Sequence, residues 1–331
     1  MSRVAVLGAG SFGTTLAIHL AQNGHDTRLW GRDPAAMARL ARERENAKFL
    51  AGFTLPAEVK VHAELEVALD RLDENDFVLF VVPSQAMRSV AAQVAVIGAR
   101  GVPVCASKGL ELGTLQRLSQ VLTQTLDDPA PVTLTGPSHA EEVARGIPTT
   151  VVAASTDEAR ARSIQVLCST PRFRVYTNDD VVGCEYGGAL KNVIAIAAGV
   201  CDGLGFGDNT KGALLTRGLA EMARLGEVMG AKRETFAGLT GMGDLIATAM
   251  SRHSRNRHVG ERLGRGDSLE QVLGAMVMVA EGVHTARAAR DLGRQRGVEM
   301  PITEQVCALF EGRDPMTALM ALMTRDLKRE V

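Results

Sequence analysis

The sequence predicts a two-domain α/β protein, with an N-terminal doubly wound, Rossmann-type, mostly parallel sheet and an all-helical C-terminal domain. Three observations support this prediction. Short apolar runs alternate with longer helical patterns through the first half, a glycine-rich motif directly follows the first apolar run, and strand patterns are absent from the second half. A chain of 331 residues is also long enough for two domains.

The apolar runs of the first half are predicted strands. Residues 77–82 are apolar without interruption, which indicates a strand buried on both faces, as in a parallel sheet covered by helices. The predicted strands are residues 4–7, 26–30, 77–82, 102–107, 132–135, 149–154 and 173–176. The predicted helices between them are residues 12–23, 34–46, 84–97 and 114–126, with one more between the last two strands. This alternation is typical of a doubly wound sheet.

Beyond residue 177 the composition changes to long stretches rich in Ala, Leu and Gly. The predicted helical stretches there are residues 181–200, 209–229, 245–263, 269–275 and 283–293. We therefore expect a dinucleotide-binding domain over residues 1–180 and an all-helical substrate-binding domain over residues 181–331. The cleft between two such domains is a natural place for a substrate site.

The charge balance and the cysteines narrow the function classes. Lys and Arg number 37 against 38 Asp and Glu, so electrostatics favour neither a nucleic-acid partner nor a membrane surface. The five cysteines include no C-x-x-C pair, which fits buried reduced thiols better than a disulfide framework or a zinc site. Because the N-terminus has no secretory pattern and the apolar runs are too short for a bilayer, we expect a cytoplasmic protein. The apolar C-terminal helices favour a homodimer.

Gly8, Gly10 and Gly13 form a G-x-G-x-x-G motif between the first predicted strand and the first predicted helix. In this context Gly8 allows a tight turn, Gly10 lets the backbone approach a pyrophosphate, and Gly13 lets helix and strand pack closely. The phosphate charge would lie on the free N–H groups at the start of the helix. The motif therefore predicts a dinucleotide cofactor.

The end of the second predicted strand bears on the choice between NAD and NADP. A carboxylate at this point binds the adenosine ribose, whereas an arginine accommodates the 2′-phosphate. Arg32 therefore favours NADP, with NAD also possible. Asp33 is better explained as the N-cap of the next helix, with Pro34 in its first position.

Two lysines are candidates for acid–base chemistry. Lys108 follows the predicted strand 102–107, at the edge of an open α/β sheet where ligands bind. Lys191 lies on the first turn of a predicted helix that is otherwise small and apolar, so desolvation and a nearby Lys108 would both lower its pKa and prepare it for proton transfer. The alternative is a lysine that extends from the end of a core helix into solvent.

Residues 251–258 combine arginines with Ser and Asn. This composition suits a phosphate monoester, because arginine offers a planar, permanently charged fork of donors. A solvated basic helix end is the alternative. Since His253 and His258 have no carboxylate or cysteine at helical spacing, we predict no metal site.

Eight segments in order resemble the soluble, NAD(P)-dependent glycerol-3-phosphate dehydrogenases of the bacterial type, and the likeness covers essentially the whole chain. The segments are residues 8–14, 107–109, 136–141, 188–192, 209–211, 241–245, 254–257 and 279–282. The resemblance implies reversible, NAD(P)H-dependent reduction of dihydroxyacetone phosphate to sn-glycerol 3-phosphate, which supplies glycerophospholipid synthesis. It implies no metal.

The same resemblance implies roles for individual residues. Lys191 would be the catalytic acid/base, with Asn192 and Thr248 as further neighbours. The residues that would bind the cofactor are Gly8, Gly10, Ser11, Phe12, Gly13, Arg32, Lys108, Ala140, Arg255, Val279 and Glu281. The residues that would bind the substrate are Lys108, Gly136, Ser138, Lys191, Asp244, Ser254, Arg255 and Asn256. Many bacterial members have Trp where this chain has Phe12, which keeps an aromatic face.

Three other functions remain open at this point. A dehydrogenase of similar build acting on a hydroxy acid or ketopantoate is the nearest, although a carboxylate substrate gives less reason for the arginine-rich segment. A nucleotide-sugar oxidising enzyme would need Cys184 or Cys201 as an activated nucleophile. A non-catalytic NADP-binding sensor shares the fold but has no use for an acid/base lysine.

Overall fold

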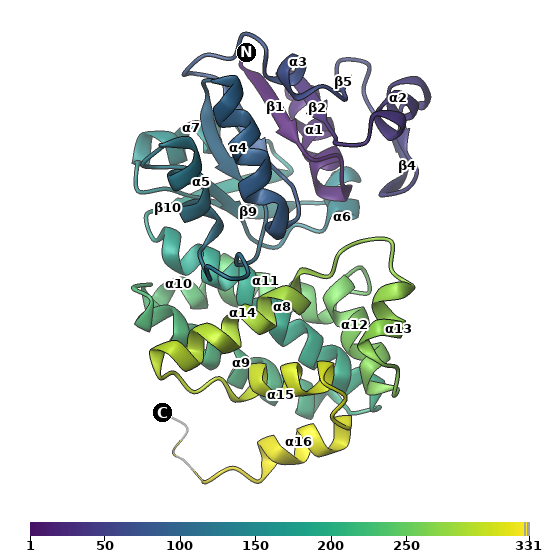
Figure 1. Cartoon of the computed structure of the whole chain (residues 1–331), viewed down its shortest axis with the longest axis vertical. Helices are drawn as coiled ribbons and strands as arrows, with labels where there is room; N and C mark the ends of the chain where they lie inside the picture. The colour runs from purple at the N-terminus through teal and green to yellow at the C-terminus, as the bar shows by residue number, and fades with distance from the viewer. Residues whose placement is uncertain (328, 330–331) are drawn as a thin grey trace.

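The computed structural model describes residues 1–327 and 329, and it consists of a sheet-containing half stacked on a helical half (Figure 1). The first half is built on an eight-stranded sheet with the strand order β10-β9-β8-β7-β6-β1-β2-β5. The strands of this sheet are β1 (Arg3–Leu7), β2 (Asp26–Trp30), β5 (Lys60–His62), β6 (Phe77–Phe80), β7 (Val102–Cys105), β8 (Val132–Thr135), β9 (Thr149–Ala154) and β10 (Phe173–Asn178). All neighbours are parallel except β8 and β9. The predicted fold class is confirmed.

Helices cover both faces of the sheet, and one buried apolar cluster lies on each face. The helices of this half are α1 (Ser11–Gln22), α2 (Pro34–Glu43), α3 (Leu65–Leu69), α4 (Met87–Ile97), α5 (Leu118–Leu126), α6 (Ala140–Ala144) and α7 (Glu158–Cys168). One cluster joins the sheet to α1, α2, α6 and α7, and the other joins it to α3, α4 and α5. This burial on both sides explains why the strands are apolar throughout.

Several predicted boundaries were wrong in the first half. The helix predicted over 34–46 ends at Glu43, because Arg44 adopts a left-handed conformation with φ 54°. The following residues pair instead in a small hairpin of β3 (Glu45–Asn46) and β4 (Leu50–Thr54), which sequence analysis did not predict. The edge strand β5 was also missed, since it is three residues long and mostly polar. The helix predicted from residue 114 begins at Leu118.

The second half contains helices only, within the described residues. Its elements are α8 (Val181–Gly203), α9 (Asp208–Val228), α10 (Arg233–Ala237), the π-helical turn η2 (Leu239–Gly243), α11 (Asp244–Met250), α12 (Arg255–Gly264), α13 (Leu269–Gly274), α14 (Glu281–Arg296), α15 (Pro301–Phe310) and α16 (Pro315–Met323). The stretch predicted over 245–263 is two helices, because Ser251 is extended and Ser254 caps the second. The last two helices were not predicted.

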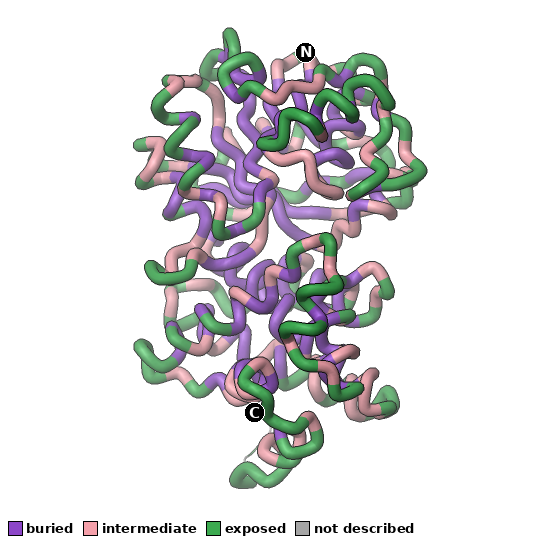
Figure 2. The backbone as a smooth tube through the Cα atoms, turned by 45° about the vertical axis from the view of Figure 1, so that its right-hand side comes forward, coloured by how far each residue is buried: buried purple, intermediate pink, exposed green. Residues whose placement is uncertain are grey.

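The long helix α8 is the centre of the second half. It has the length and hydropathy of a membrane span, yet 94% of its most apolar stretch is buried inside the protein. Its N-cap Asp180 accepts a hydrogen bond from Gly183 N at 2.8 Å. Figure 2 shows buried chain both in the sheet and among these helices. The five cysteines are all free and buried, as the sequence predicted.

Two pairs of glycines bring α8 and α12 into backbone contact. A Cβ atom at Gly199 of α8 would lie 2.0 Å from the Arg257 carbonyl oxygen, and one at Gly260 of α12 would lie 1.9 Å from the Ile196 carbonyl oxygen. Gly203 and Gly264 make the equivalent contact one turn further along. This close approach of the helix axes holds the N-terminus of α12 against the middle of α8.

Gly260→Ala is therefore expected to lower the free energy of unfolding by about 2 kcal/mol, because the added methyl group forces the two helices apart. The matched control is Gly274→Ala, since a Cβ atom at Gly274 meets nothing within 4 Å. Denaturant unfolding of the two variants measures the difference. Equal stability of the two would show that the backbone contact does not hold α12 in place.

Candidate active site

Lys191 lies in the middle of α8 and not on its first turn as predicted, because the helix already begins at Val181 behind its N-cap Asp180. The side chain of Lys191 is enclosed. The residue is 6% exposed, and the ammonium group donates hydrogen bonds to Asp244 Oδ1 at 2.8 Å and to Thr248 Oγ1 at 2.6 Å. Both partners come from α11, one helical turn apart, and Thr248 also donates to Asp244 Oδ1 at 3.2 Å. A lysine held in this way is oriented by protein groups on one helix rather than by solvent.

Lys108 reaches the same carboxylate from the sheet-containing half. It follows β7, and its ammonium group donates to Asp244 Oδ2 at 2.6 Å and to the Gly136 carbonyl oxygen at 2.8 Å. Asp244 is 2% exposed, so one buried carboxylate bridges two lysines. The three charges lie where the two halves of the molecule meet.

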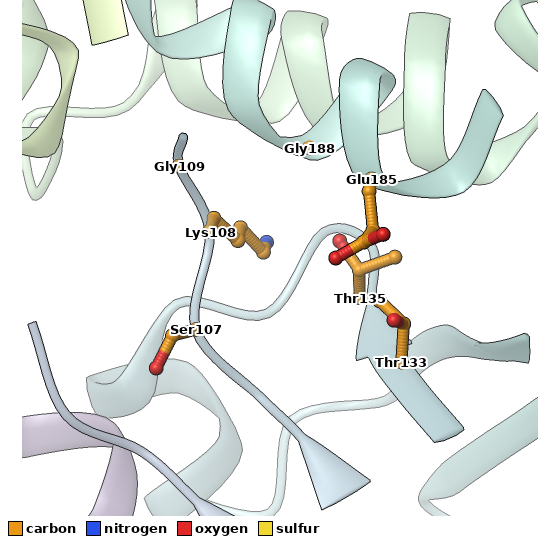
Figure 3. A pocket seen from close by; sticks show the side chains of 7 residues that line it. All are labelled: Ser107, Lys108, Gly109, Thr133, Thr135, Glu185 and Gly188. Carbon is orange, nitrogen blue, oxygen red and sulfur yellow. The ribbon is translucent and has the colours of Figure 1, made fainter. Parts of the chain in front are cut away.

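A hollow surrounds Lys108 beneath α8 (Figure 3). It is lined by Ser107, Lys108, Gly109, Thr133, Thr135, Glu185 and Gly188. A Cβ atom at Gly188 would lie 2.7 Å from Thr135 Oγ1, so glycine at this position lets α8 approach the end of β8. This approach brings Lys191, less than one turn further along α8, close to the strand ends.

The electrostatics of the site prepare Lys191 to gain and lose a proton near neutral pH. Burial lowers the pKa of Lys191 to about 8, with Lys108 adding to the decrease and Asp244 opposing it. For Asp244, burial favours the neutral form, but Lys108 and Lys191 outweigh it and hold the pKa of the carboxyl well below its usual range. The carboxylate therefore stays ionised while the amine can titrate.

The glycine-rich turn has the shape that a dinucleotide needs. Gly8 has φ 123°, and a Cβ atom there would lie 2.4 Å from the Val81 carbonyl oxygen. A Cβ atom at Gly13 would lie 1.9 Å from the Gly8 carbonyl oxygen, whereas one at Gly10 would meet nothing within 4 Å. The turn is thus tightly packed on its protein side and open above Gly10, where a side chain would fill the space for a pyrophosphate. These residues fit the cofactor.

The end of β2 presents Arg32 to solvent. Asp33 accepts a hydrogen bond from Ala36 N at 3.1 Å and Pro34 begins α2, as the sequence predicted for a capped helix. The Asp33 carboxylate is therefore occupied with the helix, whereas Arg32 makes no hydrogen bond or ion pair with any residue that the structure describes.

The loop between α13 and α14 crosses to the sheet-containing half. Met278 in this loop accepts a hydrogen bond from Ser11 Oγ at 3.2 Å, and the neighbouring Val279 is 42% exposed. Glu281, the first residue of α14, accepts a hydrogen bond from Ser84 N at 3.0 Å and a second one from the Ser84 hydroxyl. The second half thus contacts both the glycine-rich turn and the segment that follows β6.

The N-terminus of α12 presents a basic residue beside a capped helix start. Ser254 is the N-cap, and its hydroxyl accepts a hydrogen bond from Arg257 N at 3.1 Å. Arg257 is engaged by Asp202 at 2.6 Å. The Arg255 side chain donates no hydrogen bond to any described residue, although the carboxylates of Glu281 and Glu141 act on its charge. The donors of the Arg255 guanidinium are therefore available to bind an anion at the positive end of the helix.

Asn256 ties this segment to the helix that bears Lys191. Its amide nitrogen donates to Asn192 Oδ1 at 2.9 Å, and its amide oxygen accepts from Gly282 N at 3.0 Å. Asn192 directly follows Lys191 in α8. One buried amide pair thus joins α8, α12 and the start of α14.

The other candidate residues lie around the same junction. Ser138 donates to the Gly136 carbonyl oxygen at 3.0 Å. Ala140 is buried at the start of α6 and accepts a hydrogen bond from Thr15 of α1 at 3.2 Å. Phe12 is partly buried against the apolar cluster beneath α1.

Hydrogen bonds connect two groups of candidate residues and leave Arg32 outside both. Lys191, Lys108, Asp244, Thr248 and Gly136 are connected by hydrogen bonds. The second group, residues 254–256 at the start of α12, is tied to the first because Asn256 is hydrogen-bonded to Asn192, the residue after Lys191. No hydrogen bond or ion pair of the described residues links Arg32 to either group. The sequence predicts no role for Ser84, Met278 or His139, although His139 lies inside the segment 136–141 that carries the family resemblance.

Comparisons with known proteins agree along the whole chain. The family model described as the N-terminus of NAD-dependent glycerol-3-phosphate dehydrogenase matches residues 3–161, and the model of the C-terminus matches residues 180–321. The glycerol-3-phosphate dehydrogenase [NAD(P)+] of Geobacter sulfurreducens is 53% identical over 99% of this chain and 98% of its own.

Solved structures agree with the sequence matches. The crystal structure of glycerol-3-phosphate dehydrogenase from Coxiella burnetii has a TM-score of 0.94 and 36% identity, covering 98% of this chain and 99% of its own. A ketopantoate reductase from Ralstonia eutropha has a TM-score of 0.62 and 15% identity, over 97% of this chain and 99% of its own. The second likeness concerns the fold alone.

Proposed function

Because the chain belongs to the family of NAD-dependent glycerol-3-phosphate dehydrogenases, we propose that Lys191 is the acid/base with which it reduces dihydroxyacetone phosphate. The enzyme is an NAD(P)-dependent oxidoreductase that converts dihydroxyacetone phosphate and glycerol 3-phosphate into one another. The observation that carries the assignment of Lys191 is its buried ammonium group with a pKa of about 8 beside Asp244.

Lys191 acts at the oxygen of the reacting carbon. When bound, the reduced nicotinamide supplies a hydride to the carbonyl carbon of dihydroxyacetone phosphate. Negative charge develops on the carbonyl oxygen, and the Lys191 ammonium stabilises it and donates a proton. In the oxidative direction, the neutral amine of Lys191 accepts the proton of the alcohol. A pKa of about 8 keeps both forms accessible at neutral pH.

Asp244 and Lys108 set the position and charge of Lys191. Asp244 holds both ammonium groups at 2.6 and 2.8 Å and remains ionised throughout the reaction. Lys108 adds positive potential where the oxygen becomes negative, and the third N–H of its ammonium group can contact the substrate from the side of the sheet. Neither residue needs to exchange a proton.

The phosphate of the substrate binds at the N-terminus of α12. Arg255 offers there a guanidinium that donates no hydrogen bond to any described residue, and Ser254 and Asn256 flank it. Binding energy from this remote group aligns the reacting carbon with Lys191. Gly136 and Ser138 complete the substrate side opposite α12.

The cofactor is held by the glycine-rich turn and by residues from both halves. Gly8, Gly10 and Gly13 form its cradle, with Ser11 and Phe12 at the start of α1. Further cofactor-binding residues are Arg32, Lys108, Ala140, Arg255, Val279 and Glu281. Residues 1–180 thus act as the dinucleotide-binding domain and residues 181–331 as the substrate-binding domain.

The test of the activity is absorbance at the nicotinamide band after mixing the protein with NADPH and either dihydroxyacetone phosphate or ketopantoate. A fall in absorbance with dihydroxyacetone phosphate alone supports the proposal. Preferential turnover of ketopantoate would favour the rival dehydrogenase, and no turnover of either would favour a sensor.

The nucleotide-sugar alternative is disfavoured by the cysteines. Burial raises the pKa of the Cys184 thiol to about 12 and also raises that of Cys201. Neither thiol is therefore activated as a nucleophile.

Cofactor preference follows from Arg32. In Arg32→Ala, we expect the kcat/KM with NADPH to fall by roughly tenfold while that with NADH changes little, because the 2′-phosphate loses its charged partner. Arg39→Ala, in the exposed middle of α2, is the matched control. An unchanged ratio of the two efficiencies in Arg32→Ala would remove Arg32 from this role.

We also propose a cytoplasmic homodimer. The near-neutral charge gives no reason for a nucleic-acid or membrane partner. Met316, Met320 and Met323 on α16 are 45%, 50% and 71% exposed, an apolar face at helical spacing that suits a second copy. Sedimentation of the purified protein measures its oligomeric state.

A further inference from the structure

His139 connects the sheet-containing half to the helix that holds Lys191. It lies between β8 and α6, directly after Ser138 and next to the start of α6. Its ring extends to α11, where Nε2–H donates a hydrogen bond to the Ala247 carbonyl oxygen at 3.2 Å. This contact crosses the junction of the two halves.

The carbonyl of Ala247 is one that α11 cannot satisfy by itself. The last four carbonyls of an α-helix have no partner within the helix. Because α11 ends at Met250 and Ser251 is extended with ψ 134°, the Ala247 carbonyl belongs to this terminal set. His139 supplies the missing donor.

The same short helix carries both groups that hold Lys191. Asp244 is the first residue of α11 and Thr248 lies one turn later, on either side of Ala247 in the sequence. A helix of seven residues has too few hydrogen bonds of its own to be stable alone, so contacts with its surroundings fix its angle. A hydrogen bond at its C-terminal turn therefore restricts the positions of both groups.

We propose that His139 is a positioning residue for the reaction: it caps α11 and so holds Asp244 and Thr248 against the Lys191 ammonium group. The proposal rests on the proposed role of Lys191. It assigns a function to a histidine that does not itself touch the substrate or the lysine.

The surroundings of His139 suit a neutral donor. Burial lowers the pKa of its imidazole, the charges of Lys191 and Lys108 lower it further, and the bond to Ala247 and the charge of Asp244 oppose them. A neutral ring with its proton on Nε2 caps the helix without adding a third cation beside the two lysines. The ring of His253, on the turn that leads to Ser254, lies 6.3 Å from that of His139.

The test compares His139→Leu, which removes the donor, with His139→Gln, whose amide can replace it. In His139→Leu we expect the kcat for dihydroxyacetone phosphate reduction to fall about tenfold or more, since a small misplacement of catalytic groups is costly. The KM should change much less. His139→Gln should recover most of the lost rate.

A pH profile separates positioning from simple stabilisation. The charged groups that face Lys191 are Asp244 from α11, Lys108 from the loop after β7 and Arg255 from α12. Of these, Asp244 raises the pKa of Lys191, so a looser α11 should move the apparent pKa of kcat/KM downward in His139→Leu. Hydrogen exchange of the apo protein should be faster in α11 of the same variant.

The matched control is His19→Leu. His19 is another half-buried histidine bonded to a carbonyl, that of Cys168 at 2.7 Å, but both residues lie in the sheet-containing half. The His19→Leu substitution should lower the melting temperature without moving the apparent pKa of kcat/KM. If His139→Leu behaves like His19→Leu, with unchanged kcat and apparent pKa, the proposal is overturned.

Failure of this proposal is distinguishable from failure of the proposed function. An active Lys191→Ala enzyme would reject the role of Lys191, whereas an active, unshifted His139→Leu enzyme would reject only that of His139. Should His139→Leu not fold, His139→Asn gives the same comparison, because its shorter amide falls short of Ala247.

Discussion

Replacing Lys191 with alanine is expected to lower the kcat for dihydroxyacetone phosphate reduction by roughly 10³-fold or more while leaving NADPH affinity nearly unchanged. The loss combines proton transfer, which contributes about 10²–10⁴-fold, with charge stabilisation at the carbonyl oxygen. NADPH affinity should survive, because the glycine cradle lies on the sheet-containing half and makes no contact with the Lys191 side chain. Steady-state kinetics and a direct NADPH titration measure the two quantities.

The control for this variant is Lys232→Ala. Lys232 is an exposed lysine paired with Asp179 at the surface, where an ion pair contributes little to stability. Lys232→Ala should leave both the kcat and the NADPH affinity unchanged. Turnover by Lys191→Ala at more than about a tenth of the wild-type rate would exclude Lys191 as the acid/base.

Replacing Asp244 with asparagine is expected to lower both activity and stability. The substitution keeps the shape of the side chain but leaves the ammonium groups of Lys108 and Lys191 together without an anion. Breaking a buried ion pair in this way costs about 3–5 kcal/mol of folding free energy. Since Asp244 raises the pKa of Lys191, its loss should lower that pKa and with it the fraction of enzyme able to donate a proton at neutral pH.

Asp202→Asn is the matched control for Asp244→Asn. Asp202 also bridges two cations, Lys211 and Arg257, but it does not contact Lys191. Both variants should unfold at lower denaturant concentration, and only Asp244→Asn should move the apparent pKa of the reaction. An unshifted pH profile in Asp244→Asn would mean that the carboxylate stabilises the fold without tuning the lysine.

The sheet-containing half was predictable because its signals are local. Uninterrupted apolar runs identify strands buried on both faces, and Gly8, Gly10 and Gly13 stand at a spacing that one turn geometry requires. The errors occurred where the signals are weak. The strand β5 is only three residues long, too short for its pattern to stand out, and the left-handed residue that ends α2 is an arginine instead of the usual glycine.

The residues of the site were also predictable from the sequence, but the hydrogen bonds and ion pairs among them were not. Lys191, Lys108 and Asp244 could each be singled out from the residues around them or from the family resemblance. That one carboxylate bridges both lysines depends on α11 lying across α8, which involves residues more than fifty positions apart in the sequence. The hydrogen bond from His139 to the end of α11 is equally unpredictable from the sequence, because its acceptor is a backbone carbonyl, which every residue has.

The packing of α8 against α12 also could not be predicted from the sequence. The sequence contains Gly199 and Gly203 in one stretch and Gly260 and Gly264 in another, each pair four residues apart. Glycines at this spacing in two separate helices can be surface positions or a shared contact. Only the structure shows that the two pairs of glycines face one another. Their contact fixes where Arg255 on α12 lies relative to Lys191 on α8.

The pH dependence of kcat/KM in the two directions tests the role of Lys191 most directly, because this ratio reports the ionisation of the free enzyme. Reduction needs the ammonium form, so its kcat/KM should be constant below about pH 8 and fall above it. Oxidation of glycerol 3-phosphate needs the neutral amine, so its kcat/KM should fall as the pH drops below the same value. Profiles that stay flat through pH 8 in both directions, or that persist unchanged in Lys191→Ala, would contradict the assignment.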